Sequence, residues 1–174
     1  SFLSFDGAKE GGVEFYSLSK SFNLTGARIS FVVGNKQIIN KLKIFRSQID
    51  YGGFLPVQYA AIAALIGPLD VVEEQRQEYE KRNKMLCGGL RSIGWEVPDS
   101  QGTMFVWARI PEKYKSSVEF CLDLMEKTGV IVTPGNAFGS RGEGYVRMAL
   151  VVGEETISEL LSVLEESNIF SKQI

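Results

Sequence analysis

The sequence contains no histidine, and this absence excludes several kinds of catalytic site. None of its 174 residues offers an imidazole for a serine–histidine or cysteine–histidine pair, for a zinc-binding HExxH helix, or for acid–base work near neutral pH. Chemistry supported by this chain therefore depends on other groups, and the amines of lysine and the guanidinium groups of arginine are the first to consider.

Cysteine is scarce, and long apolar runs are absent. Cys87 and Cys121 are far apart and lack CxxC spacing, so we expect no metal site and no disulfide framework, but two free thiols in a reducing cytoplasm. No apolar run is long enough to span a membrane, and the first residues do not have the layout of a signal peptide. The net charge of -2, with scattered lysine and arginine, predicts no nucleic-acid partner.

The sequence does contain a cluster of amine, hydroxyl and guanidinium groups. An apolar, strand-like segment ends in Ser17 and Ser19. Lys20 follows at once, and a short turn then leads to Arg28. A lysine amine can form a Schiff base with an aldehyde, and hydroxyl groups with a guanidinium can bind phosphate, so the cluster suits an aldehyde cofactor that carries a phosphate. The alternatives are a solvated lysine, turn-forming serines and an edge-strand arginine.

Arg147 is a second notable cation because it lies in the otherwise apolar segment 145–151. A lone cation there is costly unless it meets an anion. Two alternatives stay open, a structural ion pair with a carboxylate side chain and a fork for a substrate's carboxylate. The glycine-rich residues 133–140 lack the spacing of a P-loop, and we interpret them as a pocket wall near Arg147.

In the first part of the chain the pattern predicts strands at 13–18 and 29–34, followed by two helices. Asn35 can cap the first helix. Pro56 opens the second helix, 57–66, which is apolar nearly all round and is therefore expected to be buried. The apolar positions of the first helix are Ile38, Ile39, Leu42 and Phe45.

A long polar helix is predicted from Pro68 to about Ile93, and such a helix is typical of a bridge between two lobes. The pair Gly88-Gly89 marks a bend or the end of this helix. Its thin apolar stripe comprises Val72, Tyr79, Leu86, Leu90 and Ile93.

After Gly94, strands are expected at 102–110, 130–132 and 145–151, mixed with two helices in a small α/β layer packed on one sheet. Residues 102–110 alternate, and we assign Phe105 and Trp107 to core packing. The first helix starts at a capping box and ends at Gly129, with Val118, Cys121, Leu122 and Met125 inward. The last helix runs from about Glu154 to Ser167, with Ile157, Leu160, Leu161 and Leu164 inward.

These motifs match a known family. The run Ser17-Leu18-Ser19-Lys20-Ser21-Phe22-Asn23-Leu24-Thr25-Gly26-Ala27-Arg28 resembles the cofactor-lysine signature of class I/II pyridoxal-phosphate aminotransferases, the aspartate aminotransferase fold type. Pro134-Gly135 with Phe138-Gly139, and Val146-Arg147 before Glu154-Glu155, resemble the family's C-terminal substrate-carboxylate region.

The resemblance implies an α/β fold that corresponds to the second half of such an enzyme. Residues 1–67 would be the C-terminal part of the large, cofactor-binding domain. Residues 68–94 would be a long bridging helix, and residues 95–174 a small α+β C-terminal domain.

The resemblance also implies roles for particular residues. Lys20 would be the Schiff-base lysine and proton shuttle for pyridoxal 5'-phosphate, with Ser17, Ser19 and Arg28 at the cofactor's phosphate. Arg147 would bind the α-carboxylate of the substrate. The parent enzyme would move an amino group between an amino acid and a 2-oxo acid as a homodimer. Tyr51 and Gly52 lie in a loop that, in the family, approaches the partner subunit's cofactor site.

Two alternatives keep the same fold. A β-lyase or related eliminase would use the same cofactor, because the cofactor supplies the electron sink for both reactions. The other alternative is the effector-binding domain of a bacterial transcription regulator, although the sequence has no basic recognition helix. The side chain of the substrate is not readable from the sequence.

The sequence lacks several groups that the family uses. These are the aspartate that pairs with the pyridine nitrogen, the tyrosine on the phenolic oxygen, an asparagine beside it and the glycine-rich phosphate loop, all of which lie N-terminal to the lysine. Asp6 is too close to Lys20 for the pyridine role. The chain also starts without methionine, and we expect it to be part of a longer protein.

We predict that the 174-residue chain binds pyridoxal phosphate poorly and does not catalyse transamination alone. The absorbance of the purified chain with the cofactor, and a coupled transaminase assay, check this. Detectable turnover by the chain alone would refute the prediction.

Overall fold

The computed structural model describes residues 1–170, and the chain forms two compact units, Ser1–Gln75 and Arg76–Ile174. The boundary between them falls within one long helix, α5 (Asp70–Ser92). The long helix predicted from residue 68 is therefore present. The assignment of the parts of the chain to a large domain, a bridging helix and a small domain stays a prediction.

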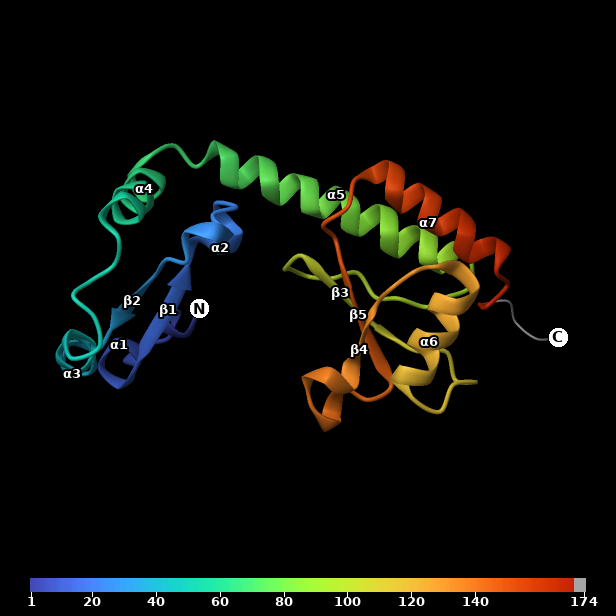
Figure 1. The fold of residues 1–174 in the computed structure, drawn as a ribbon, viewed down its shortest axis with the longest axis horizontal. Helices are drawn as coiled ribbons and strands as arrows, with labels where there is room; N and C mark the ends of the chain where they lie inside the picture. Colours follow the sequence, from blue (N-terminus) through green and yellow to red (C-terminus); the bar gives the residue numbers. More distant parts are fainter. Residues whose placement is uncertain (171–174) are drawn as a thin grey trace. The chain divides into compact units, whose positions relative to one another are not determined.

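The first unit contains a two-stranded antiparallel sheet (Figure 1). Strand β1 (Val13–Ser17) pairs with β2 (Ser30–Gly34), with Phe15 opposite Val32. The two strands predicted for this part of the chain are confirmed. The helices of the unit are η1 (Phe2–Ser4), α1 (Ala8–Gly11), α2 (Leu18–Ser21), η2 (Thr25–Ala27), α3 (Lys36–Ser47) and α4 (Leu55–Ile66).

Helix α3 begins as predicted, but the burial expected for α4 is wrong. The Asn35 Oδ1 accepts hydrogen bonds from the backbone N–H groups of Gln37 at 2.9 Å and Ile38 at 3.0 Å. On α4 the described residues include one buried side chain, Ala61, whereas Ile66 is 80% exposed. An all-round apolar pattern shows that a helix is able to be buried, but it does not supply the surface that covers it.

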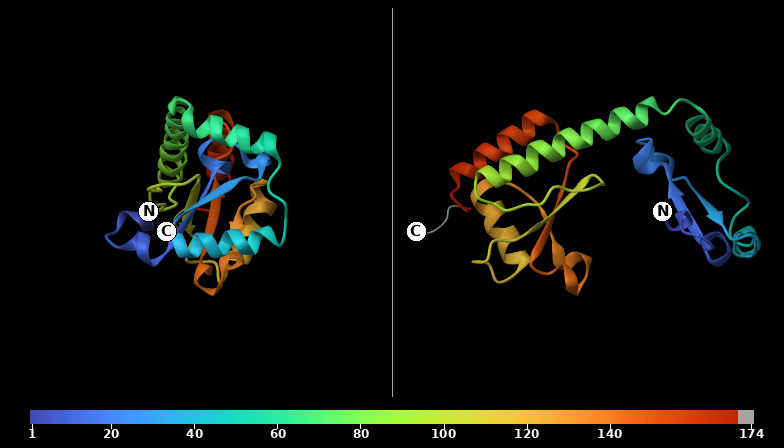
Figure 2. Two further views of the ribbon diagram at one scale, coloured as in Figure 1. Left: turned by 90° about the vertical axis from the view of Figure 1, so that its left-hand side faces the viewer. Right: turned by 180° about the vertical axis from the view of Figure 1, so that it is seen from behind.

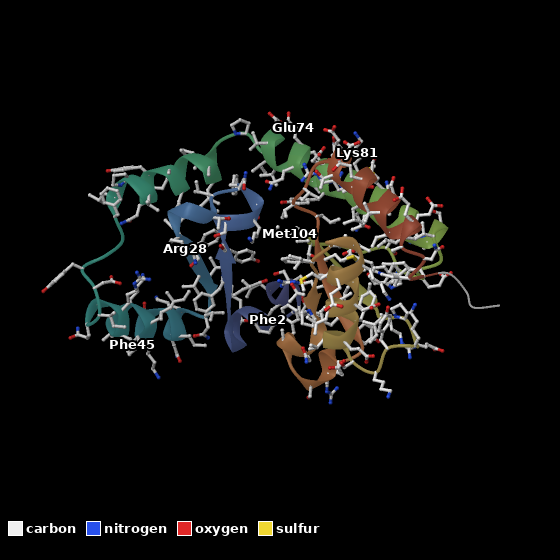
Figure 3. The ribbon with its side chains drawn as sticks, turned by 45° about the vertical axis from the view of Figure 1, so that its right-hand side comes forward. Phe2, Arg28, Phe45, Glu74, Lys81 and Met104 are labelled. Atoms are coloured by element: carbon white, nitrogen blue, oxygen red, sulfur yellow. The ribbon has the colours of Figure 1, made fainter. Side chains whose placement is uncertain are left out.

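The apolar positions expected on α3 are also largely uncovered. Phe45, labelled in Figure 3, is 65% exposed, and Ile38 is 40% exposed. None of the described residues of α3 is buried. The first unit therefore presents two helices whose apolar side chains face outward within that unit.

The second unit contains a three-stranded antiparallel sheet in the order β3-β5-β4 (Figure 1). Its strands are β3 (Phe105–Arg109), β4 (Thr133–Pro134) and β5 (Tyr145–Ala149). The strand predicted at 130–132 is wrong, because pairing with β5 begins only at Thr133, opposite Arg147. Val130 and Val132 pack against the core without joining the ladder.

One face of this sheet is covered by helices, and its side chains form the core. Val106, Ala108 and Val146 have no exposed surface. The covering helices are α5, α6 (Ser117–Thr128) and α7 (Glu154–Glu166), which Figure 2 shows from two further directions. Their core residues include Leu86, Leu90, Phe120, Leu124, Ile157 and Leu164. The inward positions predicted for the last helix are confirmed.

Helix α6 has the predicted caps but a different inward face. The Ser116 side chain accepts from the Glu119 N–H at 3.1 Å, and Gly129 ends the helix in the left-handed conformation at φ 72°. The buried side chains are Ser117, Phe120 and Leu124. Val118, Leu122 and Met125, predicted to face inward, are 41%, 51% and 41% exposed. Apolar residues occur on more than one side of this helix, so the period alone did not select the buried side.

Gly88-Gly89 does not end α5, which continues to Ser92. A Cβ on Gly89 would overlap the side chain of Leu161 on α7, whereas a Cβ on Gly88 would meet nothing within 4 Å. Gly89 therefore permits the close approach of α5 and α7. Lys81 of α5, labelled in Figure 3, pairs with Glu154 of α7 at 2.5 Å.

Within residues 1–170, no single helix is both long and apolar enough to cross a membrane. Helices α4 and α5 meet that condition only as a pair bent by 80°. The same residues contain no cluster of three or more histidine, cysteine, aspartate or glutamate side chains that could hold a metal ion. Cys87 and Cys121 are free thiols.

We predict that Gly89→Ala destabilises the second unit by about 1–3 kcal/mol, because the added methyl group must displace Leu161 from a packed interface. Gly88→Ala is the matched control. It should raise stability by about 0.5–1 kcal/mol through helix propensity alone. Urea unfolding followed by the fluorescence of buried Trp95 measures both, and equal midpoints for the two variants would contradict the proposed contact.

Candidate functional site

The Lys20 segment begins where β1 ends and turns into a single helical turn. Ser17 caps α2, and its Oγ accepts a hydrogen bond from the Ser19 N–H at 3.2 Å. Leu18 is only 3% exposed, and its N–H donates to the Ile29 carbonyl at 3.4 Å. This buried leucine anchors the turn, while the Lys20 side chain is exposed on its other side.

Hydrogen bonds connect this turn to Arg28. The Thr25 Oγ1 donates to the Ser19 carbonyl at 3.0 Å. The Arg28 Nη1 donates to the Thr25 carbonyl at 3.1 Å, and Arg28 itself has a left-handed backbone, with φ 52° and ψ 46°. Hydrogen bonds therefore hold the segment from Ser17 to Arg28 together between the paired strands. It carries the Ser17 and Ser19 hydroxyl groups, the Lys20 amine and the Arg28 guanidinium.

Most donors of this segment are not used by the described chain. Arg28 has no carboxylate partner in the described part of the molecule, and its head group is exposed. The Ser17 hydroxyl accepts a hydrogen bond, which leaves its own proton free to donate. The segment can therefore offer hydroxyl and guanidinium donors to an anion next to a lysine amine.

Tyr51 and Gly52 lie in the loop between α3 and α4. Tyr51 is fully exposed, and Gly52 has a φ of +117°. The Gly52 N–H donates to Asp50 at 2.9 Å, and Asp50 pairs with Arg46 of α3. These interactions tie the loop to α3 and do not connect it to the Lys20 segment. The role of this pair in a cofactor site stays a prediction.

Arg147 occupies the centre of the second unit's sheet. It lies on β5 between Trp107 of β3 and Thr133 of β4. Its guanidinium carbon is 4.2 Å from the centre of the Phe105 ring and 4.4 Å from the centre of the Phe138 ring. Across residues 1–170, no carboxylate forms an ion pair with Arg147, so the structural ion pair considered from the sequence is not formed there.

Aromatic side chains continue along the same face. Trp107 meets Phe138 edge-on at 5.7 Å and stacks on Tyr145 at 5.6 Å. Core packing was predicted for Phe105 and Trp107, and this is wrong because α5, α6 and α7 cover the opposite face. Trp107 is 39% exposed. The alternation of residues 102–110 separated the two faces correctly, but it did not show which residues from β5 and from the loop before it would join them.

The loop that carries Phe138 is held by a close backbone contact and a carboxylate. Gly135 in η3 (Gly135–Phe138) and Gly142 in η4 (Ser140–Gly142) leave no room for a Cβ between them. The Glu143 carboxylate accepts from the Ser117 N–H at 2.6 Å and from the Gly144 N–H at 2.8 Å. Glu143 follows Arg141 and Gly142 in the sequence, and this context did not indicate that its carboxylate would hold the loop.

These backbone donors act on the charge state of Glu143. The N–H groups of Ser117 and Gly144 lower the pKa of the Glu143 carboxyl below its ordinary value of 4.5. The Ser117 hydroxyl adds a weaker hydrogen bond at 3.2 Å. The charged carboxylate thus joins the loop before β5 to the first turn of α6.

Lys20 and Arg28 lie in the first unit, and Arg147 lies in the second. Within its own unit, each group presents cationic donors with unused hydrogen-bonding capacity. The first group combines them with an amine and hydroxyl groups, and the second with aromatic rings.

Comparison with known proteins supports one family for both units. The family model for aminotransferase class I and II matches residues 4–164. An LL-diaminopimelate aminotransferase of Halothermothrix orenii is 49% identical over 169 residues, which are 97% of this chain and 43% of that protein. The glutamate-pyruvate aminotransferase AlaC of Escherichia coli is 41% identical over 92% of this chain and 40% of its own length.

A solved structure has the same fold over the whole chain. Substrate-bound BacF from Bacillus subtilis matches with a TM-score of 0.94 and 35% identity, over 100% of this chain and 44% of that one. The chain therefore spans less than half of the length of each of these proteins.

We predict that Glu143→Gln lowers stability near neutral pH, because the charge-assisted hydrogen bonds to Ser117 and Gly144 are weakened. A carboxyl whose pKa is lower in the folded state stabilises the fold above its unfolded pKa, and this contribution is lost as the pH falls through the folded value. The difference between wild type and Glu143→Gln should therefore shrink below the ordinary pKa of 4.5.

Urea titrations at several pH values measure this effect. Glu126→Gln is the matched control, because it removes an exposed carboxylate of α6. A stability gap between wild type and Glu143→Gln that did not change with pH would contradict the role of the charge.

Proposed function

Because the chain belongs to the aminotransferase class I and II family, we propose that it supplies the cofactor lysine, phosphate-binding residues and substrate-binding arginine of a pyridoxal-phosphate-dependent aminotransferase. The observation that carries this proposal is the hydrogen-bonded segment from Ser17 to Arg28, which holds Lys20 among anion-binding donors. The chain would correspond to the end of a large domain, a long helix and a small C-terminal domain.

The donor set of the first unit fits pyridoxal 5'-phosphate. The phosphate would be held by the hydroxyl groups of Ser17 and Ser19 and by the Arg28 guanidinium, which suits a dianion. The aldehyde would be held by the Lys20 amine. When bound, the cofactor supplies an electron-withdrawing ring that stabilises negative charge at the α-carbon of an attached amino acid.

The side chains of this chain then have separate tasks. The Lys20 Nζ would hold the cofactor and would move the proton at the substrate Cα. Arg147 binds the α-carboxylate through its planar fork. Because Arg147 has no carboxylate partner in the described chain, it needs no rearrangement of an ion pair before substrate binds.

We propose LL-diaminopimelate as the first substrate to test, with a 2-oxo acid as the amino-group acceptor. The support is the name shared by relatives that are 40–49% identical to this chain. Glutamate with pyruvate is the second candidate, from the name of the Escherichia coli relative. The β-lyase and regulator alternatives have less support, because the named relatives are aminotransferases.

The assembled enzyme is proposed to be a cytoplasmic homodimer, in keeping with the family and with two free thiols. In that assembly the exposed Tyr51 and its neighbour Gly52 would approach the cofactor site of the partner subunit. Dimerisation and the proposed role of Tyr51 and Gly52 both require a second copy of the full-length enzyme.

The proposal is tested in a chimera in which this chain replaces the matching segment of the Halothermothrix orenii enzyme. After incubation with pyridoxal phosphate and reduction with borohydride, peptide mapping should find the adduct on Lys20 alone. Lys20→Ala should lower kcat by roughly 10²–10⁴-fold, the range for loss of a proton-transferring group. Lys41→Ala, on the exposed side of α3, is the matched control and should change neither result.

Two outcomes separate the competing functions. Amino-group transfer that requires a 2-oxo acid supports transamination, whereas release of ammonia without one supports elimination. A folded chimera in which Lys20 stays unmodified would overturn the assignment of the cofactor lysine.

A further inference from the structure

The guanidinium of Arg147 lies between two aromatic rings that come from different elements. Phe105 starts β3 and Phe138 ends η3. The distances of 4.2 Å and 4.4 Å to the ring centres are within the range of cation–π contact. We call Arg147 with Phe105 and Phe138 the sandwich. It joins β3, which pairs with the strand of Arg147, to the loop that follows β4.

The backbone register explains how the first ring reaches the guanidinium. Trp107 lies directly opposite Arg147, and Phe105, two residues earlier, lies diagonally from it on the same face. The residue directly opposite Phe105 is Ala149, whose small side chain leaves the face of the Phe105 ring uncovered. The Arg147 side chain occupies that space.

The second ring is supported by its neighbours. Phe138 is 48% exposed and would turn freely without a support. Trp107 meets it edge-on at 5.7 Å, and Tyr145 stacks on Trp107 at 5.6 Å with a 16° angle between the rings. The close approach of Gly135 and Gly142 holds the short helix from which Phe138 extends.

The guanidinium carbon lies over both rings, so each phenylalanine contacts the cation without forming a hydrogen bond with it. Its N–H donors all lie in the guanidinium plane. Within the described chain none of them has a hydrogen-bond partner, so these donors are available to a planar anion. A flexible arginine would lose side-chain entropy on binding a carboxylate, and a stacked one has already lost part of it.

We infer that Phe105 and Phe138 are positioning residues that hold the Arg147 fork ready for the substrate's carboxylate, and that Trp107 supports Phe138. The inference rests on the proposed role of Arg147. Neither phenylalanine touches the reacting atoms in this scheme, and each acts through the arginine. Phe138 is the ring to vary, because it is 48% exposed and lies outside the packed core.

The first test reads the sandwich itself and needs no activity. In the 174-residue chain, the Arg147 Nε–H proton should be shifted upfield by the two ring currents, relative to that of exposed Arg141. Arg147→Lys identifies the signal. Phe138→Leu should move it downfield, towards the Arg141 position, and Phe138→Tyr, which keeps the ring, should leave it near its wild-type position.

The second test separates positioning from folding in the chimera. Phe138→Leu should raise the KM for the amino acid by roughly two- to tenfold, the range expected for loss of one cation–π contact. The value of kcat should stay nearly constant, because the arginine binds ground state and transition state alike. Phe138→Tyr should restore KM, and Trp107→Leu should produce a smaller rise than Phe138→Leu.

Each result decides a separate question. An Arg147 signal that coincides with Arg141 and does not respond to Phe138→Leu overturns the sandwich. A normal KM in Phe138→Leu, or a loss of kcat with unchanged KM, overturns the positioning role. An inactive wild-type chimera with an upfield Arg147 signal counts against the proposed enzyme function and leaves the sandwich established.

Discussion

The second unit depends on the antiparallel pairing of β5 with β3. This pairing has a period of two, so it divides both strands into one face that packs against α5, α6 and α7 and another face that none of these three helices covers. Val106 and Val146 are fully buried on the first face. Arg147 and Trp107 lie on the second face. A shift of the register by one residue would exchange the two faces and bury the arginine in an apolar core.

In the first unit, local contacts fix the short turn that carries the flexible Lys20 side chain. Lysine side chains carry large rotamer entropy, and a single helical turn is too short to be stable alone. Three contacts hold this turn in place: the burial of Leu18, the Ser17 cap and the hydrogen bond from Thr25. The backbone of Lys20 is therefore fixed, whereas its side chain is exposed, and the proposed role of this lysine would need both properties.

The two units differ in how complete they are as packed structures. The second has a continuous core that runs from α5 to Phe170. The first has two long helices with exposed apolar side chains, among them Ile66 at 80% and Phe45 at 65%. The relatives are more than twice as long as the chain, which spans 43% of the Halothermothrix orenii protein. Within the first unit itself, the described residues do not cover these faces.

The sequence by itself determined much of the local structure and the family to which the chain belongs. Caps such as Asn35 and Ser116, the alternation before Ile110, the length of α5 and the Lys20 signature depend on neighbours in the chain, so short-range patterns predict them. Only the tertiary structure decided which side of α6 is buried, that α4 is uncovered, and that Phe105 and Phe138 enclose Arg147. Those outcomes depend on surfaces brought together from distant parts of the chain, and a hydrophobic period states that a face can be buried without stating what will cover it.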